Sequence, residues 1–170
     1  QEAMRRFIKT KVNEFCRGAT LTAWQVDCDG RGGECSIAAS FESDDCARAL
    51  QDRIVCDGSA MCAPVPSPLS EAQTRHHDVV FERPYTESLT TTVSAPPDWS
   101  VDVVPDEIRL KSAFGNLRRQ AKVTETGEVL STSEFTLKSA RIRSEDYAEL
   151  RGFCAAMELA RSGAAEFRRD

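Results

Sequence analysis

The sequence of 170 residues has no long apolar run, no C-x-x-C pair of cysteines and only two histidines. A membrane-spanning helix needs about 20 consecutive apolar residues, so we expect no membrane insertion. A zinc site would need pairs such as C-x-x-C together with histidines at short spacing, so we expect no metal and no cofactor. The formal net charge of -5 disfavours nucleic acid as a partner, because its phosphate backbone repels acidic proteins.

The cysteines are crowded into one part of an otherwise ordinary globular composition. Hydrophobic residues make up 41% and charged residues 29% of the chain, which suits one composite domain with a buried core. Six of the seven cysteines lie within the first 62 residues, and Cys154 stands alone. Cytosolic proteins rarely carry this density without metal or thiol chemistry. We therefore predict an extracytoplasmic location, either periplasmic or secreted.

The first residue of the sequence bears on where the protein is located. It begins with Gln1 rather than Met and shows no signal peptide, so we expect either a matured exported protein or a piece of a longer chain. The expected partner is then another protein or an upstream domain of the same precursor.

Patterning along the chain predicts four parts. Residues 1–62 should hold an N-terminal helix, a cysteine-rich hairpin and a short helix within 43–58. Residues 63–73 should form a proline-rich connection, 74–163 a β-rich part with a C-terminal helix, and 164–170 a frayed tail. The predicted fold class is α+β, with an antiparallel β-sandwich or curled sheet, a C-terminal packing helix and a disulfide-rich N-terminal part.

The stretch CDGRGGEC at 28–35 has three interpretations: a metal loop, a phosphate-binding turn or a disulfide-closed hairpin. A calcium loop that starts at Asp27 would need an acid at its twelfth position, where Ala38 stands. A phosphate-binding turn would need its glycines to open a helix, whereas strand residues follow. Both cysteines are in phase with the apolar residues of the flanking strands. Opposed residues of antiparallel strands have Cβ atoms about 4.5–5.5 Å apart, so we predict a Cys28–Cys35 disulfide.

The remaining cysteines allow weaker predictions. Cys56 and Cys62 are close in sequence and could close a short loop around Gly58. Cys16 and Cys46 both lie at predicted helix ends that border the first hairpin, and we expect them to pair. Cys154 is then the odd cysteine.

The segment from Ser144 to Gly163 predicts the last helix, with Ser144 as its N-terminal cap and Gly163 as its stop. Apolar residues recur along it at helical spacing, with Cys154 on the same stripe. We expect this stripe to dock on the sheet through four residues: Tyr147, Leu150, Phe153 and Met157.

Several short motifs from about 75 to 160 occur in an order that resembles a known family. They are a proline-containing strand, a proline before a phenylalanine–glycine turn, a hairpin and an aromatic helix; the residues are Pro96, Pro97, Trp99, Pro105, Phe114, Gly115, Gly127, Asp146, Tyr147, Leu150, Arg151 and Phe153. This stretch resembles the C-terminal β-domain of bacterial transglutaminase-like proteins that also carry an N-terminal β-domain of unknown function.

The resemblance implies that catalysis belongs to another domain. In that family a Cys, His, Asp set lies in the papain-like domain that precedes this one. The residues around Cys16 faintly echo a nucleophile motif but lack the expected glycine, and His76 and His77 lie some 60 residues away. The crowded cysteines also depart from the family. We therefore expect no catalytic residue here, and a structural thiol at Cys16.

The favoured function is a non-catalytic accessory or binding module of an exported bacterial protein. One alternative is a transglutaminase-like thiol enzyme that uses Cys16, and another is a disulfide-rich secreted inhibitor or a structural subunit of a larger assembly. Trp99, Arg118 and Arg119 form the candidate ligand surface, although both arginines also suit a solvated strand whose charges block edge pairing.

Overall fold

The computed structural model describes residues 1–16, 18–29, 35–43, 45–63 and 72–170. These residues fall into two compact units, Gln1–Arg48 and Ala49–Asp170. Most of the predicted proline-rich connection, residues 64–71, lies outside the described residues. No described helix is both long and apolar enough to cross a membrane.

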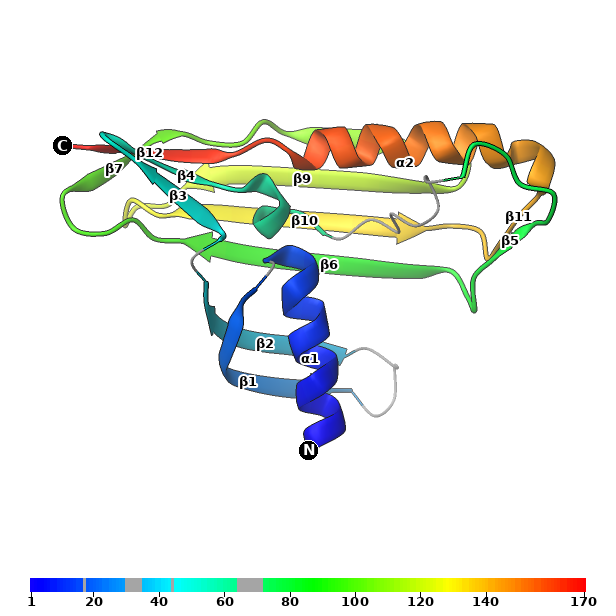
Figure 1. The fold of residues 1–170 in the computed structure, drawn as a ribbon, viewed down its shortest axis with the longest axis horizontal. Coiled ribbons are helices and arrows are strands. Elements are labelled where there is room, and N and C mark those ends of the chain that lie inside the picture. The colour runs from blue at the N-terminus through cyan, green and yellow to red at the C-terminus, as the bar shows by residue number, and fades with distance from the viewer. Residues whose placement is uncertain (17, 30–34, 44, 64–71) are drawn as a thin grey trace. The chain divides into compact units, whose positions relative to one another are not determined.

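The first unit is a helix packed on a hairpin. Helix α1 (Glu2–Phe15) precedes the antiparallel strands β1 (Thr20–Cys28) and β2 (Cys35–Glu42) (Figure 1). Ile8 and Val12, one helical turn apart, are buried against the hairpin together with Leu21.

Two disulfides hold this unit together. Cys28, the last residue of β1, faces Cys35, the first residue of β2, with their Cα atoms 4.1 Å apart. Cys16, the residue that ends α1, is bonded to Cys46, with a Cα–Cα distance of 5.6 Å. The phase of the strands brings the first pair together, because opposed residues on one face of a hairpin are nearest neighbours.

The second unit is built on antiparallel open sheets. Its main sheet has the order β6 (Tyr85–Val93), β10 (Val129–Leu137), β9 (Gly115–Val123) and β8 (Ile108–Lys111). A further sheet has the order β3 (Ala47–Leu50), β4 (Arg53–Cys56), β12 (Ala165–Arg169) and β7 (Trp99–Val103). β5 (Val79–Val80) pairs with β11 (Arg141–Ile142). The predicted α+β class with antiparallel strands and a C-terminal helix is therefore confirmed.

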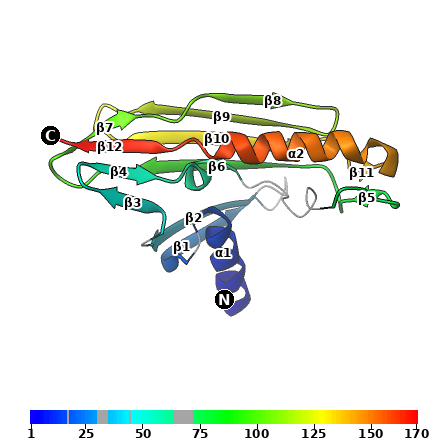
Figure 2. The ribbon, with the colours of Figure 1, turned by 45° about the horizontal axis from the view of Figure 1, so that its top comes forward.

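Alternation along β10 sets the inner face of the main sheet. Every second residue of this strand is buried, from Val129 to Leu137. Helix α2 (Tyr147–Arg161) follows the 3-10 helix η3 (Ser144–Asp146) and lies along this sheet, and β12 continues in line with it (Figure 2). Tyr147, Leu150 and Met157 are almost fully buried in the shared core. Phe153 is only half-buried at its edge.

The structure corrects two predictions about secondary structure. Strands β3 and β4 and the 3-10 helix η1 (Gly58–Met61) occupy the stretch that was predicted to be a short helix. The residues after α2, predicted to fray, form β12 between β4 and β7. Both differences have one cause: β4 and β12 are distant in sequence, and each becomes a strand because the other supplies backbone partners.

Phe167 tests whether the C-terminal strand belongs to the core. Its ring is 1% exposed, so Phe167→Ala should lower the free energy of unfolding by about 3–5 kcal/mol, measured by urea denaturation. Phe153→Ala serves as the control and should cost less, because that ring is only half-buried. An unchanged midpoint for Phe167→Ala would mean that β12 does not dock.

Candidate functional site

A groove of about 580 Å³ lies at one end of the second unit. Three segments meet there: the residues after β6, the start of β7, and the turn between β9 and β10. Its apolar lining comes from Trp99, Val101 and Val123, and its polar lining from Ser94, Thr126 and Glu128. We call it the Trp99 groove.

The chain geometry before Trp99 presents the indole to this groove. Pro96 and Pro97 lie in the connection between β6 and β7, and Asp98, which follows them, adopts a left-handed backbone with φ of 66°. The carbonyl of Asp98 accepts a hydrogen bond from the N–H of Asp170 at 3.0 Å, and Trp99 pairs with Arg169 of β12. Trp99 is half-buried, and Val101 lies on the same face of β7.

Glu128 is the polar centre of the groove. One of its carboxylate oxygens accepts a hydrogen bond from Ser94 Oγ, and the other accepts one from Thr126 Oγ1 at 2.9 Å. These bonds, with that from Ser94 the stronger, hold the pKa of Glu128 below its usual range. The carboxylate therefore stays ionised at neutral pH and links the end of β6 to the β9–β10 turn.

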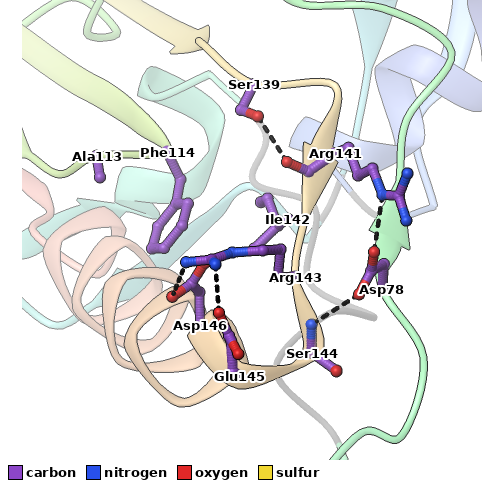
Figure 3. A pocket seen from close by; sticks show the side chains of 10 residues that line it. All are labelled: Asp78, Ala113, Phe114, Ser139, Arg141, Ile142, Arg143, Ser144, Glu145 and Asp146. Atoms are coloured by element: carbon purple, nitrogen blue, oxygen red, sulfur yellow. Dashed lines mark hydrogen bonds and ion pairs between the residues drawn. The ribbon is translucent and has the colours of Figure 1, made fainter.

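A second groove, of about 670 Å³, surrounds the start of α2 (Figure 3). Asp78 accepts hydrogen bonds from Arg141 Nε at 2.7 Å and from the backbone N–H of Ser144 at 2.9 Å. Arg143 pairs with Asp146 at 3.0 Å and with Glu145. Each of these charges already has an opposite charge beside it, so we interpret this groove as scaffolding that fixes the start of α2.

The candidate ligand surface is divided by the structure. Trp99 lines the groove, and Arg118 is exposed on the outer face of β9. Arg119 is 1% exposed and therefore cannot take part in a surface site. Adjacent strand residues point to opposite faces, and Arg119 points inward, where its Nη2 donates to the carbonyl of Asp106 at 3.1 Å.

The thiols are inaccessible in the described part of the chain. Cys16 is bonded to Cys46 and is 2% exposed. Burial raises the pKa of the three free thiols, Cys56, Cys62 and Cys154. For Cys62 the guanidinium groups of Arg119 and Arg161 partly offset that rise. Buried thiols with raised pKa values are poor nucleophiles.

The predicted Cys56–Cys62 disulfide is wrong, since both residues are free. Cys56 ends β4 opposite Ala165 of β12. The 3-10 helix η1 then carries the chain onward, and Cys62 enters the core beneath α2. Closeness in sequence therefore did not bring the two sulfur atoms together.

The two histidines and the described acidic residues form no metal site. His76 and His77 are exposed in a bend that precedes β5. Among the residues that the structure describes, no group of three or more His, Cys, Asp or Glu side chains could hold a metal ion.

Sequence reasoning missed the carboxylate of the Trp99 groove. Ser94 and Glu128 are 34 residues apart, and nothing in the local pattern of either segment indicates that they meet. The one sequence signal for this site was the predicted hairpin turn at Gly127, because a turn there places Thr126 and Glu128 at the ends of the two strands. In the structure Gly127 has a φ of 78°, which suits glycine.

Comparison with known proteins gives a family and a fold. The family described as "Domain of Unknown Function with solved-structure structure (DUF3858)" matches residues 62–162. A crystal structure from Parabacteroides distasonis, described as a "putative protease", shares the fold with a TM-score of 0.53 and 14% sequence identity. The similarity covers 71% of this chain but only 24% of that chain. No curated protein matches the sequence.

Asp78 tests the scaffolding role of the second groove. Its hydrogen bond from Arg141, the backbone bond from Ser144 and the nearby charges hold its pKa below the usual range. The carboxylate therefore stabilises the fold above its unfolded pKa, and that stabilisation is lost as the pH falls through the lower, folded value. Asp78→Asn should lower the melting temperature at neutral pH, by less than Phe167→Ala does, and the difference from wild type should vanish in acid.

The matched control is Asp102→Asn, since Asp102 is exposed on β7. It should leave the melting temperature unchanged across the same pH series. A deficit of Asp78→Asn that persists undiminished in acid would contradict the ionic role of Asp78.

Proposed function

The chain belongs to the DUF3858 family of domains of unknown function, and from this premise we propose that it is a non-catalytic accessory or binding module of a larger exported bacterial protein. The catalytic chemistry of such a protein, of the transglutaminase-like kind that the motifs of residues 75–160 suggest, would belong to another domain of the same precursor. This module would then bind a partner or hold a ligand near that domain.

The observation that carries the proposal is the state of Cys16. It was the one residue that the sequence offered as a nucleophile, and it is bonded to Cys46 and buried. A thiolate must be free and accessible to attack an acyl group. The remaining thiols are buried with raised pKa values.

The size of the similar protein supports a modular role. The fold occurs in a Parabacteroides chain described as a "putative protease", of which the similarity covers 24%. The rest of that chain leaves ample room for a separate catalytic domain. By analogy we propose that this module accompanies such a domain, as one part of a larger architecture.

The two disulfides support an extracytoplasmic location. Cytosolic glutathione and thioredoxin keep thiols reduced, whereas the periplasm and the extracellular space let disulfides persist. The Cys16–Cys46 and Cys28–Cys35 bonds are consistent with a periplasmic or secreted protein. We further propose that its partner is another protein or an upstream domain of the same precursor.

Native thiol labelling tests the proposal. Folded protein treated with iodoacetamide near neutral pH, without reductant, should show no labelling of Cys16 and only slow labelling of the three buried thiols. After unfolding, those three should label fully. Peptide mapping without reduction should recover Cys16 linked to Cys46 and Cys28 linked to Cys35.

Rapid labelling of Cys16 in the folded protein would contradict a non-catalytic role and favour a thiol enzyme. The control is the same protein after mild reduction, in which Cys16 and Cys46 should become reactive together. Reactivity of Cys16 before reduction, with Cys46 unlabelled, would be the decisive contrary result.

A further inference from the structure

We propose that the Trp99 groove binds an uncharged saccharide, with a sugar ring stacked on the indole of Trp99 and a sugar hydroxyl donating to the carboxylate of Glu128. This inference names a ligand class for the binding role proposed above and rests on that role. It concerns the groove at the end of the second unit only.

The shape and lining of the groove suit a ring that is apolar on its faces and polar at its edges. Trp99 is half-buried, and Val101 and Val123 extend its apolar surface. Val123 is 47% exposed, and the same groove is lined by the hydroxyl-bearing residues Ser94 and Thr126. A sugar ring has C–H groups on its faces, which pack on an indole, and hydroxyl groups at its rim.

The polar side of the groove is preorganised. Glu128 accepts hydrogen bonds from Ser94 and from Thr126, and Thr126 is in turn hydrogen-bonded to Thr124 at 2.8 Å. The N–H of Glu128 also donates to Thr124 Oγ1 at 3.1 Å. This network fixes the carboxylate in one position before any ligand arrives, which reduces the entropy lost on binding.

The charge of the groove distinguishes between ligand classes. An ionised Glu128 accepts strong hydrogen bonds from hydroxyl donors and repels anions, so acidic saccharides and phosphates are disfavoured. A cation could also approach an indole beside a carboxylate. However, both carboxylate oxygens of Glu128 already accept hydrogen bonds from hydroxyl groups. These bonds reduce the negative charge that is available to attract a cation. An uncharged polyhydroxyl ligand fits this arrangement better.

The second groove offers no comparable site. Its arginines, Arg141 and Arg143, are paired with neighbouring carboxylates (Figure 3). A ligand there would have to break those ion pairs, whereas a sugar in the Trp99 groove would use an exposed apolar surface and the remaining lone pairs of Glu128.

Tryptophan fluorescence provides a direct test, because the chain has only two tryptophans. In a Trp24→Phe background, Trp99 is the sole indole. This full-length variant is titrated with maltotriose, cellotriose and chitotriose, each up to about 10 mM, a range that would saturate a site with a millimolar Kd. We expect a saturable blue shift of the Trp99 emission with at least one of them.

Two substitutions in the groove, with one control elsewhere, test whether the fluorescence change comes from binding in the groove. Glu128→Gln removes the charge but keeps the shape, and it should weaken binding about tenfold, as expected for a lost charge-assisted hydrogen bond. Glu134→Gln, at an exposed position of β10 on the opposite face from the buried core, is the matched control and should leave the affinity unchanged. Binding to Trp99→Ala, measured by calorimetry, should be lost.

The contrary outcomes are specific. No saturable shift with any of the three trisaccharides would overturn the saccharide inference. A saturable response to tetramethylammonium chloride that Glu128→Gln abolishes, without a response to sugars, would reassign the groove to cations. Either result can occur while Cys16 stays unreactive, so failure of this inference is distinguishable from failure of the non-catalytic role.

Discussion

The core of the second unit depends on the burial of the inner face of the main sheet. Strand β10 pairs along its whole length with β6 on one side and β9 on the other, and its buried residues Phe135 and Leu137 share one core with α2. Two further buried residues of β10 are serines. Ser131 donates to the carbonyl of Met61 at 2.8 Å, and Ser133 accepts from the N–H of Ala63 at 2.6 Å. These bonds satisfy buried backbone groups, so the end of η1 and the residues that follow it are anchored to the sheet by polar contacts within an apolar core.

The same sheet explains why the candidate site lies at a strand end. Inside the sheet, side chains point alternately to the core and to the outer face, and backbone groups form hydrogen bonds with neighbouring strands. After the end of β6 and in the β9–β10 turn this alternation ends, so the side chains of Ser94 and Glu128 can point toward each other and form a hydrogen bond. Binding residues are often held on loops that a rigid scaffold positions. The Trp99 groove follows this arrangement, with β7 supplying the aromatic side chain.

Much of the fold could be predicted because its signals are local. The period of two in β1, β2, β9 and β10, the apolar stripe of α2 and the glycine at the β9–β10 turn each reflect a single element. Predictions that depended on distant partners were less successful. Residues 43–58 were predicted to be a short helix from their capping residues, yet β4 within this stretch pairs with β12 in a sheet. Phe167 looked like part of a frayed end, yet it is 1% exposed.

The sequence by itself determined the class of fold, the phase that sets Cys28 opposite Cys35, and the buried stripe of the last helix, because each follows from the geometry of one strand pair or one helix. Only the tertiary structure decided that Cys56 and Cys62 stay apart, that Arg119 faces the core while Arg118 faces solvent, and that Ser94, Trp99 and Glu128 share one groove. These outcomes depend on which distant strands pair and which face each sheet buries. Those choices are set by the packing of the whole core rather than by any local pattern.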